Sequence, residues 1–343
     1  MNSYYMDKLE ILKDIFGAQH VVLSDDHLVV DGRRYPIVDD VIITLEPSQI
    51  PHAIKVRLTE SLEKDVERVP FAADIQSTFA REWETFPDIL PEHKSEFEQY
   101  FDLVNVDELR GKRIADLGCG IGRWSYFIQE ISRELVLVDF SEAIFVARRN
   151  LRQASQSVFV MADVQQLPFR DDFADFILCL GVLHHLPVNA LSAVRQISHL
   201  APRMLIYLYS ALDGRPMHYR LLLGPMNVVR RLVCNVQNTI FRALFTWLAT
   251  CLLYLPFIGL GYIARLFGLS RFVPMFDFYH GKSLRRIRQD AYDRFFTRIE
   301  QRFNRTQIQI LENVFDRITV SDQIPMWHFL CERGINDRTH PQS

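Results

Sequence analysis

The residues best suited to chemistry form a glycine-rich segment, DLGCGIG, from Asp116 to Gly122. A β-branched run precedes it and a helical run begins at Arg123, so we expect a strand, a tight turn and a helix N-terminus, as in nucleotide-binding folds. Glycines allow sharp turning and close approach of the backbone to a ligand. A dinucleotide loop would need glycine at position 123, and a carboxylate at position 116 would repel a pyrophosphate. The spacing therefore favours a ligand that lacks phosphate and has a cationic amino-acid end.

Three further strand ends carry groups that suit the rest of such a ligand. Asp139 ends the run ELVLVDF, 21 positions after Gly118, where a ribose-binding acid is expected. Asp163 ends a third run and can accept a hydrogen bond from an adenine amino group, while Val164 covers the ring. A fourth run leads into CLGVLHHL, whose backbone at Leu180 would face the amino-acid end.

These four elements together resemble the class I S-adenosylmethionine-dependent methyltransferases, in particular the subgroup with V-L-H-H-L after the fourth strand. The resemblance covers residues 112–208 and implies S-adenosyl-L-methionine as the cofactor. It also implies a Rossmann-like α/β sheet of seven strands, mostly parallel with the last strand antiparallel. The cofactor-binding residues that it implies are Asp116, Gly118, Cys119, Gly120, Gly122, Asp139, Phe140, Asp163, Val164 and Leu180.

Two histidines, His184 and His185, are candidate general bases because they follow the fourth strand at the sheet edge where ligands bind in open α/β sheets. A packing or helix-start role is the alternative for both. No N-P-P-Y or D-P-P-Y run follows this strand, and no Pro-Cys pair occurs there, so methylation of an adenine amine or of cytosine C5 is not expected.

The residues that could select the substrate lie in a basic segment between Ala211 and Arg305. It contains 15 Lys or Arg against 5 Asp or Glu. A solvated face is the ordinary explanation, but Arg294, Arg298 and Arg302 recur at four-residue spacing, and on one helix they would share a face that could bind an anionic substrate. The related enzymes often point a Tyr or Asp from this region into the pocket. The candidate substrate contacts are Tyr279, His280, Asp293, Arg294, Arg298 and Arg302, with Tyr292 as a candidate catalytic residue.

An uncharged apolar run of transmembrane length extends from Ala243 to Ala264. A single crossing would separate the last two strands from their sheet, and Pro256, Gly259 and Gly261 are expected to break the run into two short helices. It then either roofs an apolar pocket, which we favour, or lies as a monotopic surface on lipid. Both alternatives imply a partly apolar substrate, and Trp83 of the preceding helical segment is a candidate to close the pocket from the other side.

The elements that must position these residues follow βαβ periodicity. Strands are expected at RIADLG, ELVLVDF, VFVMADV, ADFILCL and RMLIYLY, and the runs ITVSDQIP and MWHFLCERG are expected to form a hairpin that completes the sheet. The expected organisation is an N-terminal extension with a hairpin at residues 1–60, a helical preface at 61–111, the cofactor-binding core at 112–210, an inserted helical cap at 211–303, and the last helix and hairpin at 304–336. The segment YPIVDD resembles zinc-ribbon-like modules that precede some methyltransferases, but it has no cysteine, so no metal is expected.

The composition is that of a folded globular protein, with 48% hydrophobic and 24% charged residues and a net charge of -3. The charge gives no case for nucleic acid, and five scattered cysteines suggest reduced thiols in a cytoplasmic protein. We expect methyl transfer to a small, partly apolar and anionic molecule, with the acceptor atom and oligomeric state left open. The alternatives are a lipid or quinone methyltransferase at a membrane surface and a non-catalytic cofactor-binding scaffold.

Overall fold

The computed structural model describes residues 3–58 and 72–334, so the parts of the expected segments at 61–71 and 335–336 lie outside the described residues. Strands and helices alternate through the centre of the chain, as the hydrophobic pattern predicts. The core elements are β5 (Arg113–Leu117), α5 (Ser125–Ile128), β6 (Glu134–Asp139), α6 (Ala143–Asn150), β7 (Ser157–Met161), β8 (Phe176–Leu180), α7 (Ala190–Ile197) and β9 (Arg203–Tyr207). All residues of β5, β6, β7 and β8 are buried, as expected for parallel strands covered on both faces.

The core strands lie in the order β7-β6-β5-β8-β9-β13-β12. Neighbours from β7 to β9 are parallel, whereas β13 (His328–Glu332) is antiparallel to both β9 and β12 (Arg317–Val320). The predicted terminal hairpin and its place in the sheet are therefore correct. Its preceding helix is the short α13 (Arg305–Gln309), capped by the side chain of Asn304.

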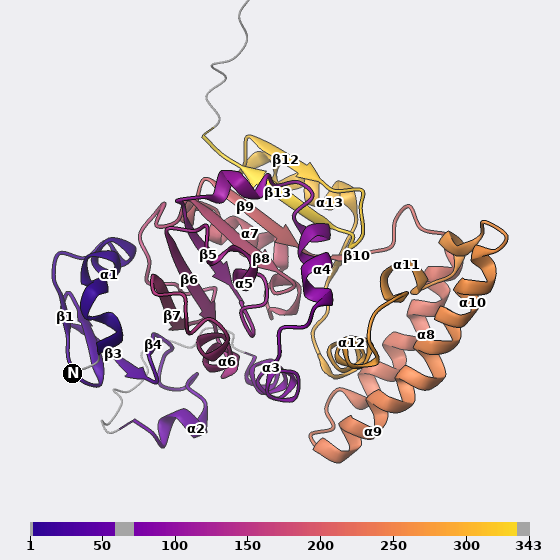
Figure 1. Ribbon diagram of the computed structural model, residues 1–343, viewed down its shortest axis with the longest axis horizontal. Coiled ribbons are helices and arrows are strands. Elements are labelled where there is room, and N and C mark those ends of the chain that lie inside the picture. Colours follow the sequence, from indigo (N-terminus) through magenta and orange to yellow (C-terminus); the bar gives the residue numbers. More distant parts are fainter. Residues whose placement is uncertain (1–2, 59–71, 335–343) are drawn as a thin grey trace, which may run out of the picture.

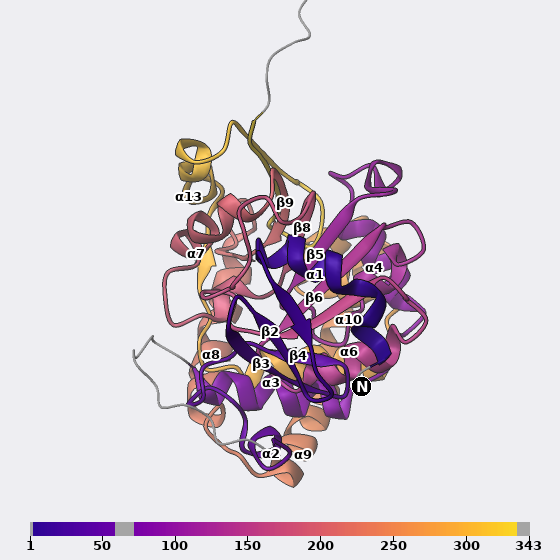
Figure 2. The same cartoon turned by 90° about the vertical axis from the view of Figure 1, so that its left-hand side faces the viewer.

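The sheet has 11 strands rather than the expected seven because the N-terminal strands join it. They are β1 (Val21–Leu23), β2 (His27–Val30), β3 (Arg33–Val38) and β4 (Val41–Ile43). The hairpin predicted within residues 1–60 is β2-β3, which turns at Gly32, and β4 then pairs in parallel with β7. This layer faces the viewer in Figure 2, with α1 (Leu9–Phe16) in front of the strands. The pairing of β4 with β7 was not predicted, because the two strands are more than a hundred residues apart in the sequence.

The predicted helical preface contains α3 (Ala73–Thr85) and α4 (Glu92–Tyr100), after a short α2 (His52–Lys55). In Figure 1, α3 and α4 lie between the sheet and the inserted cap. The cap comprises α8 (Met217–Val233), α9 (Thr239–Ala249), a π-helical turn η5 (Thr250–Tyr254), α10 (Leu255–Arg265), α11 (Phe276–Tyr279) and α12 (Leu284–Phe296). Two short strands, β10 (Tyr209–Ser210) and β11 (Arg302–Phe303), pair where the chain leaves and re-enters the core.

The prediction that Pro256, Gly259 and Gly261 break the apolar run was wrong. The run lies in one continuous helix, Thr239–Arg265. The amide of Leu255 donates to the carbonyl of Thr250, five residues back, so the π turn shifts the hydrogen-bond register before the proline ring. A glycine in a helix interior costs only about 1 kcal/mol. Gly261 also has a packing role, because a Cβ there would lie 2.0 Å from the Phe276 ring.

Candidate active site

The glycine turn after β5 is held in a conformation that side chains would disturb. Gly118, Gly120 and Gly122 have φ values of 76°, 55° and 75°. A Cβ on Gly118 would lie 2.3 Å from Val182, and one on Gly120 would lie 3.1 Å from the Trp83 ring. The turn is therefore a bare-backbone surface enclosed by side chains from the loop after β8 and from α3, as a closely bound ligand requires.

Asp139 links the end of β6 to this turn. Its Oδ2 accepts the amide hydrogen of Gly120 at 2.9 Å, and its Oδ1 accepts the amide and hydroxyl hydrogens of Ser141 at 2.9 and 2.7 Å. Burial raises the pKa of Asp139. Asp163, after β7, accepts the amide hydrogen of Gln165 at 2.9 Å, and burial raises its pKa too. Both carboxyl groups lie at the carboxyl edge of the parallel strands, where α/β sheets bind ligands.

One cavity of about 410 Å³ joins this edge to the cap. Eight of the predicted cofactor-binding residues line it: Gly118, Cys119, Gly120, Asp139, Phe140, Asp163, Val164 and Leu180. Of the predicted catalytic and substrate residues, it is lined by Trp83, His185, Tyr279, Asp293, Arg294 and Arg302. The core and the inserted cap thus enclose a single site.

Two predicted cofactor contacts lie beneath the turn instead of on the cavity wall. Asp116 is 1% exposed and its Oδ2 accepts the hydroxyl hydrogen of Ser125 at 2.8 Å. Gly122 faces Leu151, which a Cβ would approach to 2.3 Å. Both residues shape the turn through packing and hydrogen bonding, so a direct role in ligand contact does not follow from their positions.

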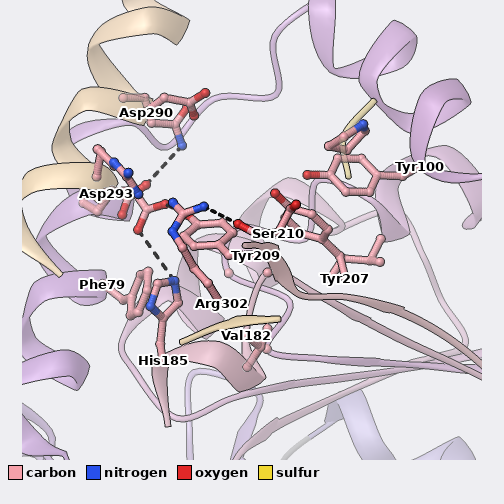
Figure 3. A pocket seen from close by; sticks show the side chains of 18 of the residues that line it. Phe79, Tyr100, Val182, His185, Tyr207, Tyr209, Ser210, Asp290, Asp293 and Arg302 are labelled. Carbon is pink, nitrogen blue, oxygen red and sulfur yellow. Dashed lines mark hydrogen bonds and ion pairs between the residues drawn. The ribbon is translucent and has the colours of Figure 1, made fainter. Parts of the chain in front are cut away.

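His185 and Asp293 form a pair of titratable groups on the cavity wall (Figure 3). The Nδ1–H of His185 donates to the carbonyl of Ile299 at 2.8 Å, which leaves Nε2 as the basic nitrogen of the neutral ring. That Nε2 lies 3.9 Å from Oδ1 of Asp293. The hydroxyl of Tyr209 donates to Oδ2 of Asp293 at 2.7 Å, and burial and the Asp293 charge raise the Tyr209 pKa well above its usual value. The cluster can accept a proton at Nε2 and stabilise the resulting cation.

The remaining predicted residues do not line the cavity. His184 is fully buried and stacks on Tyr209 with ring centroids 3.9 Å apart, so its packing alternative fits the structure. The Tyr292 hydroxyl accepts a hydrogen bond from Arg242 of α9, on another side of α12 from Asp293. The ring of His280 stacks on Phe276.

The three spaced arginines do not share a helical face. The helix α12 ends at Phe296, where Thr297 adopts an extended conformation and its hydroxyl donates to Asp293. Arg298 is exposed and pairs with Asp74, whereas Arg302 lies in β11. Arg294 and Arg302 both bind the buried Glu300, each at 2.7 Å. Glu300 and Asp74 therefore neutralise most of the charge of these three arginines. The structure does not favour the predicted binding of an anionic substrate by all three.

Several cavity residues were missed by sequence reasoning. Arg123 directly follows the glycine turn, and its guanidinium lies over the rings of Trp124 and Trp83, at 4.4 and 5.5 Å from their centroids. Glu82 on α3 is 2% exposed and its Oε2 has no hydrogen-bond partner within the described chain. Tyr209 is the third missed residue. The position of Arg123 next to the glycine turn could have indicated that it lines the site. The positions of Glu82 and Tyr209 on the cavity wall could not be predicted, because they depend on how α3 and β10 pack in the folded protein.

These residues fit S-adenosylmethionine at the cofactor end of the cavity. The bare turn accommodates a closely packed ligand, and the unpartnered Glu82 oxygen and the Arg123 guanidinium match an ammonium and a carboxylate. Asp139 can bind ribose hydroxyls, and Asp163 with Val164 can bind adenine.

Comparison with known proteins agrees with this geometry. Residues 114–202 match the family model described as a methyltransferase domain. The central domain is a class I S-adenosylmethionine-dependent methyltransferase domain. The match begins in β5 and ends before β9, so it contains the glycine turn, Asp139, Asp163 and His185, while the N-terminal layer and the cap lie outside it.

Two curated relatives are similar to part of this chain. The tRNA U34 carboxymethyltransferases of Campylobacter hominis and Sulfurimonas denitrificans are 31% and 32% identical to it over 93 and 91 residues. The matches cover 26% and 25% of this chain, and the chain spans about a third of those relatives' length, 33% and 31%.

Solved structures show similarity over a larger share of the chain. A 1,6-didemethyltoxoflavin-N1-methyltransferase of Burkholderia thailandensis, solved with S-adenosylhomocysteine, is 23% identical, with 45% of this chain and 69% of that chain covered and a TM-score of 0.36. An N-methyltransferase of Bradyrhizobium japonicum is 19% identical, with coverages of 39% and 72% and a TM-score of 0.34.

Proposed function

We propose that this protein transfers the methyl group of S-adenosylmethionine to a small, partly apolar acceptor that bears an O–H or N–H group. The observation that carries this proposal is the single cavity, which is lined at one end by the glycine turn and at the other by His185 and Asp293. Leu222, Leu223 and Met226 of α8 add an apolar wall on the acceptor side.

The bound cofactor supplies an electrophilic methyl group on a sulfonium, so the protein must chiefly position the acceptor and remove its proton. We assign proton removal to Nε2 of His185. Asp293 favours the protonated ring that results, and Tyr209 holds the carboxylate through its hydrogen bond of 2.7 Å. A positioned general base contributes roughly 10²- to 10⁴-fold to a rate.

The names of the two curated relatives raise tRNA as another acceptor. The matches span only 93 and 91 residues of this chain, whereas the acceptor side of the cavity is lined by residues of the cap. The apolar wall of α8 favours a small molecule over a phosphate-rich chain. A non-catalytic scaffold is the alternative from another class.

Calorimetric titration with S-adenosylmethionine and S-adenosylhomocysteine tests the cofactor site, and the absence of binding would contradict both the enzyme and the scaffold. Turnover is then measured on a panel of phenols, amines, carboxylates, quinones and tRNA. Methylation of tRNA alone would contradict the small-molecule assignment, and cofactor binding without any product would favour the scaffold.

The base assignment is tested with His185→Gln. We expect the turnover number to fall by about 10²-fold or more while S-adenosylhomocysteine affinity stays within about twofold, because the imidazole acts on the acceptor. Arg298→Gln, outside the cavity, is the control. Turnover equal to that of the unchanged protein would exclude His185 as the base.

A further inference from the structure

The outer side of the cap is covered with exposed apolar side chains. Nineteen of the 25 large apolar side chains that are exposed among the described residues lie between Met217 and Phe272. On α8 they are Met217, Leu221, Val228, Val229 and Leu232, and on the long helix and the segment after it they are Ile240, Phe241, Leu244, Trp247, Leu248, Leu252, Leu255, Leu260, Tyr262, Ile263, Leu266, Phe267, Leu269 and Phe272. We call this set the outer face. Large apolar patches on a protein surface mark interaction sites.

The two helices that carry the outer face lie side by side (Figure 1). The start of α8 is tied to the segment after α10, because the Tyr219 hydroxyl donates to the carbonyl of Arg271 at 2.9 Å and His218 Nε2 bonds to the carbonyl of Phe272 at 2.6 Å. Their inner sides pack on α12 through a separate apolar core that includes Met226 and Tyr254. The pair is therefore a slab with one side packed and the other exposed.

The charge of this slab is of one sign. Residues 214–276 contain seven arginines and no Asp, Glu or Lys. Arg220, Arg231, Arg265 and Arg271 are exposed, so cations border the apolar side chains of the outer face. Exposed apolar and aromatic side chains with arginine at their edges are the pattern of helices that lie in a membrane interface.

We propose that the outer face docks on a lipid bilayer with anionic headgroups, with α8 and the helix Thr239–Arg265 lying in the plane of the interface. The apolar side chains enter the boundary of the acyl chains, and the exposed arginines bind phosphate-bearing headgroups. Because Leu222 and Met226 of α8 also line the cavity, docking places the acceptor side of the site next to the lipid. Docking itself does not depend on the catalytic proposal.

A second copy of the chain is a poorer occupant of the outer face. A two-fold contact would place the arginines of one copy against those of the other, and the absence of acidic residues at 214–276 leaves nothing on the slab to pair with them. Anionic lipid supplies the missing negative charge. The charge pattern therefore selects lipid over self-association.

The helix Thr239–Arg265 is long and apolar enough to cross a membrane, the one such helix among the described residues, yet its contacts favour an in-plane position. Arg242 is 1% exposed and donates to the Tyr292 hydroxyl at 2.8 Å, and Thr246 and Thr250 are buried on the same side. A crossing would surround these polar groups with lipid and remove the hydrogen bonds that join Arg242 to Tyr292 and Thr246 to Arg288 of α12.

Flotation of the full-length protein with vesicles tests the proposal. The vesicles contain phosphatidylcholine alone or phosphatidylcholine with phosphatidylglycerol. The unchanged protein should float with the anionic vesicles and bind neutral ones about tenfold less. Leu266→Glu combined with Phe267→Glu should abolish flotation, because these side chains are 82% and 72% exposed on the outer face. Arg265→Gln combined with Arg271→Gln should reduce binding to anionic vesicles only.

Matched controls are Met6→Glu combined with Ile310→Glu, exposed apolar residues outside the cap, and Arg149→Gln combined with Arg152→Gln, exposed arginines on the core. Both controls should float like the unchanged protein. S-adenosylhomocysteine affinity, measured on every variant, reports the catalytic site separately. Equal flotation of the outer-face variants, no flotation of any form, or a dimer that Leu266→Glu and Phe267→Glu dissociate would overturn the proposal.

Discussion

Two buried aspartates next to the glycine turn have different roles. Asp139 lines the cavity and also accepts the amide hydrogen of Gly120, so a ligand-binding carboxylate is itself part of the turn. Asp116 lies farther in, where burial raises its pKa to about 7 despite the hydrogen bond from Ser125. The neutral Asp116 therefore supports the turn at low pH, and its ionisation is opposed by the surrounding apolar residues and by Asp139.

The raised pKa of Asp116 makes a prediction about stability. The unfolded chain ionises this group above pH about 4, whereas the folded chain keeps it neutral up to about pH 7, so folding takes up a proton between these values. The contribution of Asp116 to the free energy of unfolding is full below pH 4 and is lost as the pH rises to 7. The stability of Asp116→Asn relative to the unchanged protein should therefore increase by roughly 1–3 kcal/mol as the pH rises from 5 to 8.

Urea unfolding of the cofactor-free protein at several pH values measures this difference. Asp107→Asn, at an exposed side chain, is the control and should follow the pH profile of the unchanged protein. A constant difference between Asp116→Asn and the unchanged protein across this range would contradict the assignment.

At the residue scale, sequence reasoning succeeded where position along a strand decides the direction of a side chain. Asp139 ends the buried strand β6 and Asp163 follows the end of its parallel neighbour β7, so both had to reach the same sheet edge. The choice between Tyr292 and Asp293 could not be made in this way. They are neighbours on α12, separated by about 100° around the helix axis, and only the packing of α9 on that helix shows that the tyrosine faces away from the cavity.

The element that organises the cap is α12, together with the turn that follows it. Glu300 in this turn is buried and binds Arg294 and Arg302, and the Arg230 guanidinium of α8 lies 3.9 Å away. Burial raises the pKa of Glu300, but these arginines outweigh it and hold the pKa well below its usual range. One carboxylate thus ties α8, α12 and β11 together.

Removal of that charge should loosen the cap. Glu300→Gln leaves Arg230, Arg294 and Arg302, whose side chains are only 8%, 14% and 20% exposed, without their counter-charge, and breaking a buried pair costs about 3–5 kcal/mol. Arg298→Gln, which removes the exposed pair with Asp74, should cost about 0–1 kcal/mol and is the matched control. Chemical unfolding compares the two variants. Similar losses of stability for both would show that Glu300 does not hold the cap together.

The helices and strands that could be predicted are those whose formation depends on residues close to one another in the sequence. The core strands follow from uninterrupted apolar runs bounded by turns, and their ends agree closely with the structure. The continuity of the helix Thr239–Arg265 could not be predicted in this way. The π turn after α9 depends on a hydrogen-bond pattern that the sequence does not reveal, and the packing of Phe276 on Gly261 brings together residues of different elements. We therefore expected a break within a helix that is continuous in the structure.

At the scale of the whole molecule, the sheet extends from the N-terminal strands through the methyltransferase core to the terminal hairpin, and the cap covers the carboxyl edge. The strand β4 covers the edge of β7, with Val41, Ile42 and Ile43 almost completely buried. The buried Tyr5 strengthens this junction, since its hydroxyl donates to the carbonyl of Asp40 and accepts from the amide of Phe159. The N-terminal layer thus protects an edge strand that the core alone would expose.

Loss of this layer should cause association. A chain that begins at residue 72 would expose the edge of β7 and the apolar surface under β4, and unprotected strand edges pair with other chains. We expect it to elute as oligomers or to precipitate at micromolar concentration, as measured by size-exclusion chromatography with light scattering. Val22→Lys on the exposed side of β1 leaves β4 in place and should behave like the unchanged protein. If the shortened chain shows the same association state as the full-length protein and binds S-adenosylhomocysteine, β4 is not needed to cover that edge.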